Sequence, residues 1–302
     1  MSDDNHNIRS IESIGWFILH CLLFSLISVL TKYVMKTGIS IVEIIAFQTF
    51  FTFIFLTIIK KGTFKILPTK RILFLHAVRA FLWLIATAIF FKSLNHISLP
   101  KATSLSFSTP LFTIIFAIII LKEVMRKHYI IPLFLGFIGM LVILRPGFDG
   151  YDSESLLVLV ACILWSITDI IIKHLCASHK NANITWFFTG FSFLMILPIL
   201  PQFWTTPNIM QFGIMMAIAV LFLLNILSLT NAYKLGSMTV MQPFAFTNLI
   251  FVAILSYFVF DEMIVTPTII GSVIIIMSTS FIAYNERKKY QKWLSYKIGS
   301  DF

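Results

Sequence analysis

The stretch IFAIIILKE at residues 115–123 decides the fold, because an apolar run ends there abruptly at a lysine and a glutamate. The chain repeats this pattern at residues 254–262, which read ILSYFVFDE. A helix of about 20 apolar residues crosses a bilayer, and charged side chains collect at its ends because a charge at the bilayer centre is costly. Each edge is therefore predicted to lie where the membrane meets water.

The composition excludes a soluble globular domain. Hydrophobic residues make up 58% of the chain and charged residues 12%, and the mean hydropathy is +0.92. A soluble domain carries about 25% charged residues, so this chain has too little polar surface to cover a body in water.

Ten apolar segments are separated by short loops, and most of the Lys, Arg and Asp lie outside the segments. Only helices and closed barrels satisfy every backbone group in hydrocarbon, and continuous apolar runs favour helices over the alternating strands of a barrel. We therefore expect an all-α polytopic membrane protein with ten transmembrane helices. The segments are 13–31, 41–59, 72–91, 99–121, 129–144, 156–175, 184–200, 209–231, 238–260 and 265–284.

The positive charges are distributed unequally between the two sides of this arrangement. With a cytoplasmic N-terminus, 17 of the 23 Lys and Arg lie in cytoplasmic loops or tails, 5 lie outside and Arg79 lies within a span. Cytoplasmic loops carry the excess of Lys and Arg, so we expect a multi-pass protein of the cell inner membrane with both termini cytoplasmic. The five outer residues are Lys32, Lys36, Lys92, Lys101 and Arg145.

This topology also accounts for most of the net charge of +10. The basic tail 287–297 is expected to attract anionic lipid, and no nucleic-acid partner is expected. The sequence does not decide between a monomer and a homodimer.

The two charged edges suggest an internal repeat. Glu123 and Glu262 are 139 positions apart, and at that offset the two halves align as five segments each. Five is odd, so the halves are predicted to have inverted topology, as in many secondary transporters whose substrate site lies between the repeats. The expected organisation is a cytoplasmic N-terminal tail (1–12), a first repeat (13–146), a connecting loop (147–154), a second repeat (155–284) and a basic cytoplasmic tail (285–302).

The motifs around the first edge resemble a known family. SFSTPLFTIIFAIIILKE (106–123) followed by GFIGMLVILRP (136–146) resembles the EamA-type branch of the drug/metabolite transporter superfamily. The resemblance implies two inverted five-helix repeats around a central cavity, with no metal, no other cofactor and no ATP motor. A proline within a span also predicts a kink. The candidate structural or gating residues are Pro110, Glu123, Gly136, Gly139, Pro243, Glu262 and Gly271.

Within this superfamily, the motifs TDIIIK (168–173) and FWTTP (203–207) resemble those of S-adenosylmethionine uptake transporters. That likeness implies uptake of this metabolite, or its exchange for S-adenosylhomocysteine. Three positions depart from the pattern: Gln48 replaces an arginine, Lys92 a tyrosine and Ala80 a glycine. A related transporter with another substrate therefore stays open.

Three charged residues within the spans are candidates for contact with substrate. Glu43 could bind a cation, a proton or a cationic substrate, or could be an interfacial carboxylate at a helix N-terminus. Arg79 lies deep enough to need a partner or a wet cavity, and could hold a substrate carboxylate. Asp169 could contact substrate, or form a local ion pair with Lys173 one helical turn later.

Aromatic and amide side chains complete the candidate site. Trp83 and Trp165 each lie near an intramembrane charge, and could stack on a ring or hold a cation or simply pack. The three cysteines have no metal-binding spacing, and are interpreted as small packing residues. The candidate substrate-binding residues are Glu43, Gln48, Arg79, Trp83, Trp165 and Asp169.

These observations favour a secondary transporter that moves a small charged or zwitterionic metabolite by alternating access. An exporter of amino acids, metabolites or drugs is the main alternative within transport. An integral-membrane enzyme is less well supported, because the intramembrane acids are scattered and no catalytic or metal-ligating motif is found.

Overall fold

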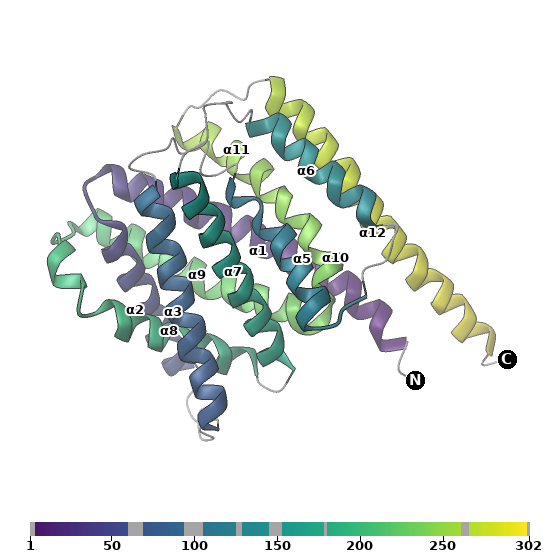
Figure 1. Cartoon of the computed structure of the whole chain (residues 1–302), viewed down its shortest axis with the longest axis horizontal. Helices are drawn as coiled ribbons and strands as arrows, with labels where there is room; N and C mark the ends of the chain where they lie inside the picture. The colour runs from purple at the N-terminus through teal and green to yellow at the C-terminus, as the bar shows by residue number, and fades with distance from the viewer. Residues whose placement is uncertain are drawn as a thin grey trace.

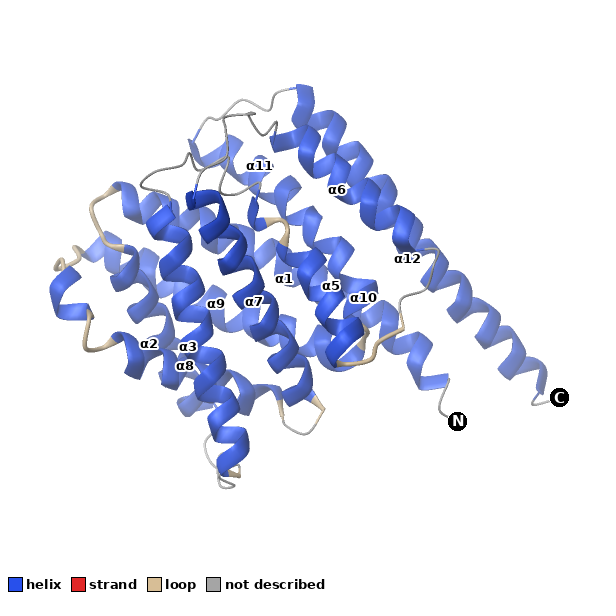
Figure 2. Ribbon diagram, in the orientation of Figure 1, coloured by secondary structure: helices blue, strands red, loops and turns tan. Residues whose placement is uncertain are grey.

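The computed structural model describes residues 4–59, 69–93, 105–124, 129–144, 153–177, 180–260 and 266–300. Over these residues the protein is helical throughout, without a strand (Figures 1 and 2). The elements are α1 (Asp4–Lys36), α2 (Ile41–Ile59), α3 (Lys70–Ser93), α5 (Thr109–Ile120), α6 (Ile130–Leu144), α7 (Ser153–Cys176), α8 (Asn181–Ile196), η2 (Leu200–Phe203), α9 (Ile209–Leu235), α10 (Met238–Met241), η3 (Gln242–Phe246), α11 (Thr247–Phe260) and α12 (Thr266–Ser300).

Among the described residues, six helical stretches are long and apolar enough to cross a membrane. They are Ile11–Lys36, Ile41–Ile59, Lys70–Phe90, Ser155–Cys176, Ile209–Leu235 and Met238–Val259. The other predicted segments correspond to shorter apolar helices, so the all-α polytopic class is confirmed while the number of ten spans stays a prediction.

The ends of the chain differ from the expectation. Helix α1 begins at Asp4 rather than near residue 13, and α12 continues to Ser300 rather than ending near residue 284. Neither Pro nor Gly interrupts residues 4–12 or 285–298, so nothing in these segments breaks a helix. The expected tails are therefore largely helical extensions of the first and last apolar segments.

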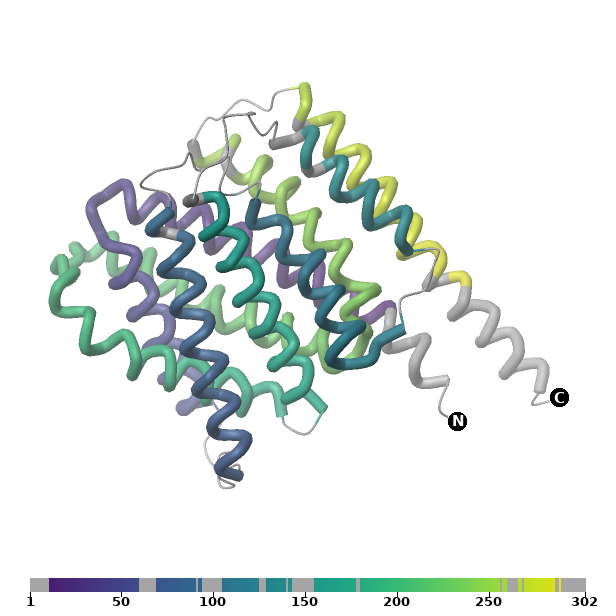
Figure 3. The backbone as a smooth tube through the Cα atoms, viewed as in Figure 1, coloured from purple at the N-terminus to yellow at the C-terminus, as the bar shows by residue number. Residues whose placement is uncertain are grey.

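The most extensive helix contacts join the first half of the chain to the second, as the backbone trace in Figure 3 shows. The contact between α1 and α9 corresponds to the contact between α7 and α3. In the same way, the contact between α1 and α11 corresponds to the contact between α7 and α5. Likewise α2 packs on α9 while α3 packs on α8, and the pairs α2–α8 and α6–α12 are each extensive. When the helices of the two halves are matched in order, each of these contacts has a counterpart.

The crossing of α6 and α12 shows this reciprocity at the level of single residues. A Cβ atom on Gly139 would lie 2.8 Å from the carbonyl oxygen of Gly271, and the Ser278 hydroxyl donates to the carbonyl of Pro132. Gly139 and Ser278 are 139 positions apart, as are Pro132 and Gly271. Each contact therefore joins the positions equivalent to those of the other contact, with the two helices exchanged. Such a pair of contacts is typical of a two-fold relation. Figure 1 shows α6 and α12 side by side.

Large apolar side chains also cover much of the outer surface. Ile131 and Phe134 on α6 are 68% and 62% exposed, and Met277 on α12 is 62% exposed. A soluble protein rarely exposes contiguous apolar surface of this kind. These faces fit contact with lipid.

We expect Gly139→Ala to lower the thermal unfolding temperature in detergent, because its Cβ would overlap the backbone of α12. Such overpacking typically costs about 1–3 kcal/mol. Gly213→Ala on α9 is the matched control: its Cβ would have no neighbour within 4 Å, and alanine favours a helix by roughly 1 kcal/mol. Equal unfolding temperatures for the two variants would contradict the close α6–α12 crossing.

Candidate functional site

Arg79 lies buried between helices rather than at a headgroup region. Its side chain is 2% exposed, and its guanidinium carbon lies 4.0 Å from the centre of the Phe188 ring on α8. Trp83, one turn later on α3, packs edge-on against the same ring with centroids 5.5 Å apart. Phe188 therefore holds the cation and the indole together, an arrangement that a cation–π contact stabilises.

Asp169 on α7 extends this cluster with a negative charge. Its carboxylate faces the Tyr233 hydroxyl and interacts electrostatically with Arg79. The Tyr233 hydroxyl in turn accepts a bond of 3.1 Å from Gln242 Nε2. Within the described part of the chain, Arg79 Nη1 is buried without a hydrogen-bond partner. The network thus offers a spare donor beside a carboxylate and two aromatic faces.

The possible local pair between Asp169 and Lys173 does not form. Lys173 donates to the carbonyl of Tyr233 at 2.5 Å and to that of Gly236, and its Nζ lies 4.0 Å from Glu123 Oε1. The two side chains leave α7 toward different partners because Asp169 has the Tyr233 hydroxyl within reach.

Glu43 is buried within the protein, in the first turn of α2, so its position at a helix N-terminus agrees with one of the two interpretations. Its Oε2 accepts a bond of 3.0 Å from the backbone amide of Thr205, while its Oε1 has no hydrogen-bond partner in the described ranges. Trp204 beside it stacks on Phe47 with centroids 5.9 Å apart. The motif FWTTP is thereby tied to the start of α2.

The other candidate residues lie in different surroundings. Gln48 is buried on α2, and Trp83 packs with Ile45 and Ala46 of the same helix, so α2 adjoins the Arg79 cluster. Trp165 packs on Phe90 with centroids 5.5 Å apart, about three helical turns along α3 from Arg79. The structure therefore brings Arg79 and Trp83 together around Phe188, and Asp169 interacts electrostatically with Arg79. Trp165 lies one helical turn before Asp169 on α7 and packs on Phe90.

Glu123 forms what we term the latch, made of Glu123, Lys173 and residues 236–239. Its carboxylate accepts bonds from the Ser237 hydroxyl at 2.6 Å, the Thr239 amide at 3.1 Å and the Met238 amide at 3.2 Å. A negative charge at the start of α10 is favourable because the first amides of a helix lack partners. Glu123 of the first half thus closes on the second half.

The abrupt end of the apolar run places Glu123 in the latch. Lys122 has a positive φ of 56°, and the Glu123 amide donates back to the Ala117 carbonyl at 3.1 Å. This left-handed residue ends α5 at a cost of roughly 1–2 kcal/mol. Residues 261–265, including Glu262, lie outside the described residues.

Two helices are interrupted at matching places. At the first interruption, two side chains of α7 contact backbone carbonyls of the interrupted segment. A turn at residues 107–108 precedes α5, so Pro110 lies in its first turn rather than at a mid-helix kink. Cys162 Sγ lies 3.5 Å from the Leu105 carbonyl, and the Ser166 hydroxyl donates to the Thr109 carbonyl at 3.0 Å.

Helix α1 does the same for the second interruption, the 3-10 segment η3 that contains Pro243. Cys21 Sγ lies 3.7 Å from the Phe244 carbonyl, and the Ser25 hydroxyl lies 3.3 Å from the Asn248 carbonyl. These acceptors lie 139 positions after Leu105 and Thr109 respectively. The cysteines are thus more than packing residues: with the serines four positions later, they form two matched clamps between the halves.

Gly136 and Gly139 keep α6 close to its neighbours. A Cβ on Gly136 would lie 2.7 Å from the Phe246 ring, and Phe246 ends the interrupted segment η3. Gly136 thus admits the ring of η3, as Gly139 admits the backbone of α12.

Comparison with known proteins identifies a family. The model described as the EamA-like transporter family matches residues 12–145 and 153–284. The S-adenosylmethionine uptake transporter of Rickettsia felis (strain ATCC VR-1525 / URRWXCal2) is 30% identical over 92% of this chain and 94% of its own length. The Rickettsia bellii (strain RML369-C) transporter of the same name is 28% identical over 92% and 96%.

More distant relatives have other names. The riboflavin transporter of Brucella anthropi is 28% identical over 74% of this chain and 81% of its own. A solved crystal structure, described only as that of a protein, has a TM-score of 0.73 and 14% identity, covering 91% of this chain and 98% of its own. At that identity the structural likeness shows a shared fold alone.

We expect Glu123→Gln to weaken the latch, because the charged acceptor of three hydrogen bonds is lost, and bonds to charged groups contribute about 1.5–3 kcal/mol. Cys176, buried behind Lys173, should then react with a permeant maleimide about tenfold faster, as read by site-resolved mass spectrometry. Glu12→Gln on the exposed side of α1 is the control. An unchanged Cys176 rate in Glu123→Gln would rule out the latch.

Proposed function

Because the chain belongs to the EamA-like transporter family, we propose that it is a secondary transporter that takes up S-adenosylmethionine by alternating access. The likeness to uptake transporters for this metabolite over 92% of the chain supports the substrate. The site that carries the proposal is the cluster of Arg79, Asp169 and Trp83. Transport, rather than catalysis, also agrees with the names of these relatives.

The chemistry of the cluster suits this substrate. S-adenosylmethionine carries a carboxylate, an ammonium, a sulfonium and an adenine ring. The spare Nη1 donor of Arg79 suits the carboxylate, and Asp169 suits the ammonium. The rings of Trp83 and Phe188 suit the sulfonium or the adenine.

We further propose ten transmembrane helices in two inverted repeats, with both termini on the cytoplasmic side. The reciprocal helix contacts and the two matched clamps support the inverted repeats. The excess of Lys and Arg in the loops on one side supports the orientation. In this topology the latch lies at the cytoplasmic end.

Alternating access then has a defined sequence. Substrate reaches the Arg79 cluster while the latch is closed, and the two halves rock until the latch opens and the opposite end closes. A substrate can drive this exchange only through a different affinity for the two states. Gln242 links the two regions, because it contacts Tyr233 of the cluster and lies three residues after Thr239 of the latch.

Export of another metabolite is the second candidate. The pseudopaline exporter CntI of Pseudomonas aeruginosa is 25% identical over 66% of this chain, so the family includes exporters. Gln48 is buried on α2, and a neutral residue there, where the related pattern has a charged one, would favour a different substrate.

The proposal is tested by uptake of labelled S-adenosylmethionine into cells that express the chain. We expect time-dependent uptake, and competition by excess S-adenosylhomocysteine. Arg79→Lys should reduce uptake at least tenfold, or about 1.4 kcal/mol, because an ammonium does not reproduce the two-pronged guanidinium contact.

Arg71→Lys at the exposed start of α3 is the matched control and should retain uptake. Immunoblots of the membrane fraction establish equal amounts of each variant. Absence of uptake by the wild-type chain present in the membrane would disprove the substrate. Outward movement of preloaded substrates would support export instead.

A further inference from the structure

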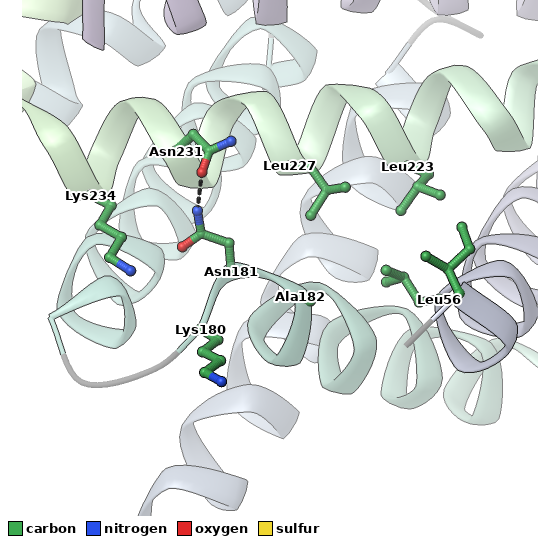
Figure 4. Close-up of a pocket in the computed structure, with 9 residues that line it drawn as sticks. Leu56, Lys180, Asn181, Ala182, Leu223, Leu227, Asn231 and Lys234 are labelled. Carbon is green, nitrogen blue, oxygen red and sulfur yellow. Dashed lines mark hydrogen bonds between the residues drawn. The ribbon is translucent and has the colours of Figure 1, made fainter. Parts of the chain in front are cut away.

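A pocket of about 560 Å³ lies between α2, α8 and α9, away from the Arg79 cluster (Figure 4). One end of the pocket is polar and the other is apolar. Its lining is Leu56, Ile59, Lys180, Asn181, Ala182, Leu223, Leu227, Asn231 and Lys234.

The polar end is suited to an anion with a hydroxyl group. Lys180 and Lys234 come to it from two different helix ends, and the Asn181 amide donates to Asn231 Oδ1. Asn181 Oδ1 is buried and, within the described ranges, has no hydrogen-bond partner. Lys180 precedes α8 without a side-chain cap, so the first amides of α8 add to the positive potential.

The apolar end reaches the surroundings of the protein at Ile59, which is 65% exposed at the end of α2. Leu56 and Leu223, which also line this end, are buried. The Trp186 indole donates to the Thr57 hydroxyl at 2.8 Å across α2 and α8. Tryptophan is enriched where hydrocarbon meets headgroups, so the pocket is expected near that boundary, with its polar end toward the headgroups.

We propose that the pocket binds one anionic glycerophospholipid, with its phosphate on Lys180 and Lys234, a headgroup hydroxyl on Asn181 Oδ1, and an acyl chain along Leu223 and Leu227. Basic pockets between helices on the cytoplasmic side bind such headgroups. A water-soluble anion would leave the apolar wall unused, whereas a phospholipid matches both ends.

This site is distinct from the basic tail and lies at the same end as the latch. Lys234 lies between Tyr233 and Gly236 in the sequence. The carbonyls of Tyr233 and Gly236 both accept hydrogen bonds from Lys173 of the latch. Only the assignment to the cytoplasmic leaflet rests on the proposed topology. The lipid would bridge α2 of the first half to α8 and α9 of the second, and so would stabilise the latched arrangement.

The test is a titration of the purified full-length chain in detergent with phosphatidylglycerol, phosphatidylcholine or inorganic phosphate, followed by native mass spectrometry and thermal unfolding. We expect one tightly retained phosphatidylglycerol and a higher unfolding temperature, with little effect of the other two. The double substitution Lys180→Glu/Lys234→Glu should weaken binding at least tenfold. Leu227→Trp, which fills the apolar end, should weaken it with the charges intact.

Lys70→Glu is the matched control, because Lys70 is an exposed lysine at the start of α3 that does not line the pocket. Equal binding by the wild type and the double variant would overturn the proposal. So would equal losses in the double variant and Lys70→Glu, or equal affinity for inorganic phosphate. The readout is lipid retention, so these outcomes leave the transport proposal untouched, and absence of transport would leave the lipid site standing.

Discussion

The fold depends on the need to satisfy every backbone carbonyl inside a membrane. Two helices are interrupted, near residue 107 and at η3, and backbone carbonyls beside each interruption face a helix of the other half. Cys162 and Ser166 of α7 capture those of Leu105 and Thr109, while Cys21 and Ser25 of α1 capture those of Phe244 and Asn248. Each clamp joins one half of the chain to the other. Interrupted helices at corresponding places are also where transporters of inverted-repeat architecture bind their substrates.

Glu123, which ends the apolar run of the first half, also satisfies backbone groups, in its case at the start of a helix. Glu123 satisfies the first amides of α10, and Lys173 satisfies the last carbonyls of α9 while facing Glu123. Unpartnered backbone groups and two opposite charges are thereby neutralised together. Because Tyr233 contributes its carbonyl to this arrangement and its hydroxyl to Asp169, one residue connects the latch to the substrate cluster. A short chain of direct contacts therefore runs from the latch to the cluster.

The sequence predicts the helical class and the importance of Arg79, because apolar runs and an intramembrane arginine are strong local signals. It also predicts a repeat offset of 139 positions, which the residues of the α6–α12 crossing and the acceptor carbonyls of the clamps share, while the clamp donors are 141 positions apart. It does not predict that Asp169 contacts Tyr233 instead of Lys173, since helical spacing says nothing of a partner 64 positions away. Phe188, Tyr233 and Ser237 were missed for the same reason: one phenylalanine among 32 carries no signal until a neighbouring helix places Arg79 over it. The paired Cys-x-x-x-Ser spacing on α1 and α7 was the available signal for the clamps.

Several contacts of the described residues lack a counterpart in the other half, and one of these differences has a direction. Helix α1 packs on α12, with Ile14 and Phe17 in the same cluster as Ile282 and Met238 near the latch. Its counterpart would join α7 to α6, and no extensive contact between these two helices exists in the described residues. Under an inverted two-fold relation, the counterpart contact belongs to the opposite end of the molecule. Two halves related in this way can be equally closed at both ends or closed at only one, and a contact present at the latch end without its counterpart corresponds to the second case. With the latch at the cytoplasmic end, as proposed, this is the arrangement that an uptake transporter adopts before it binds substrate from outside.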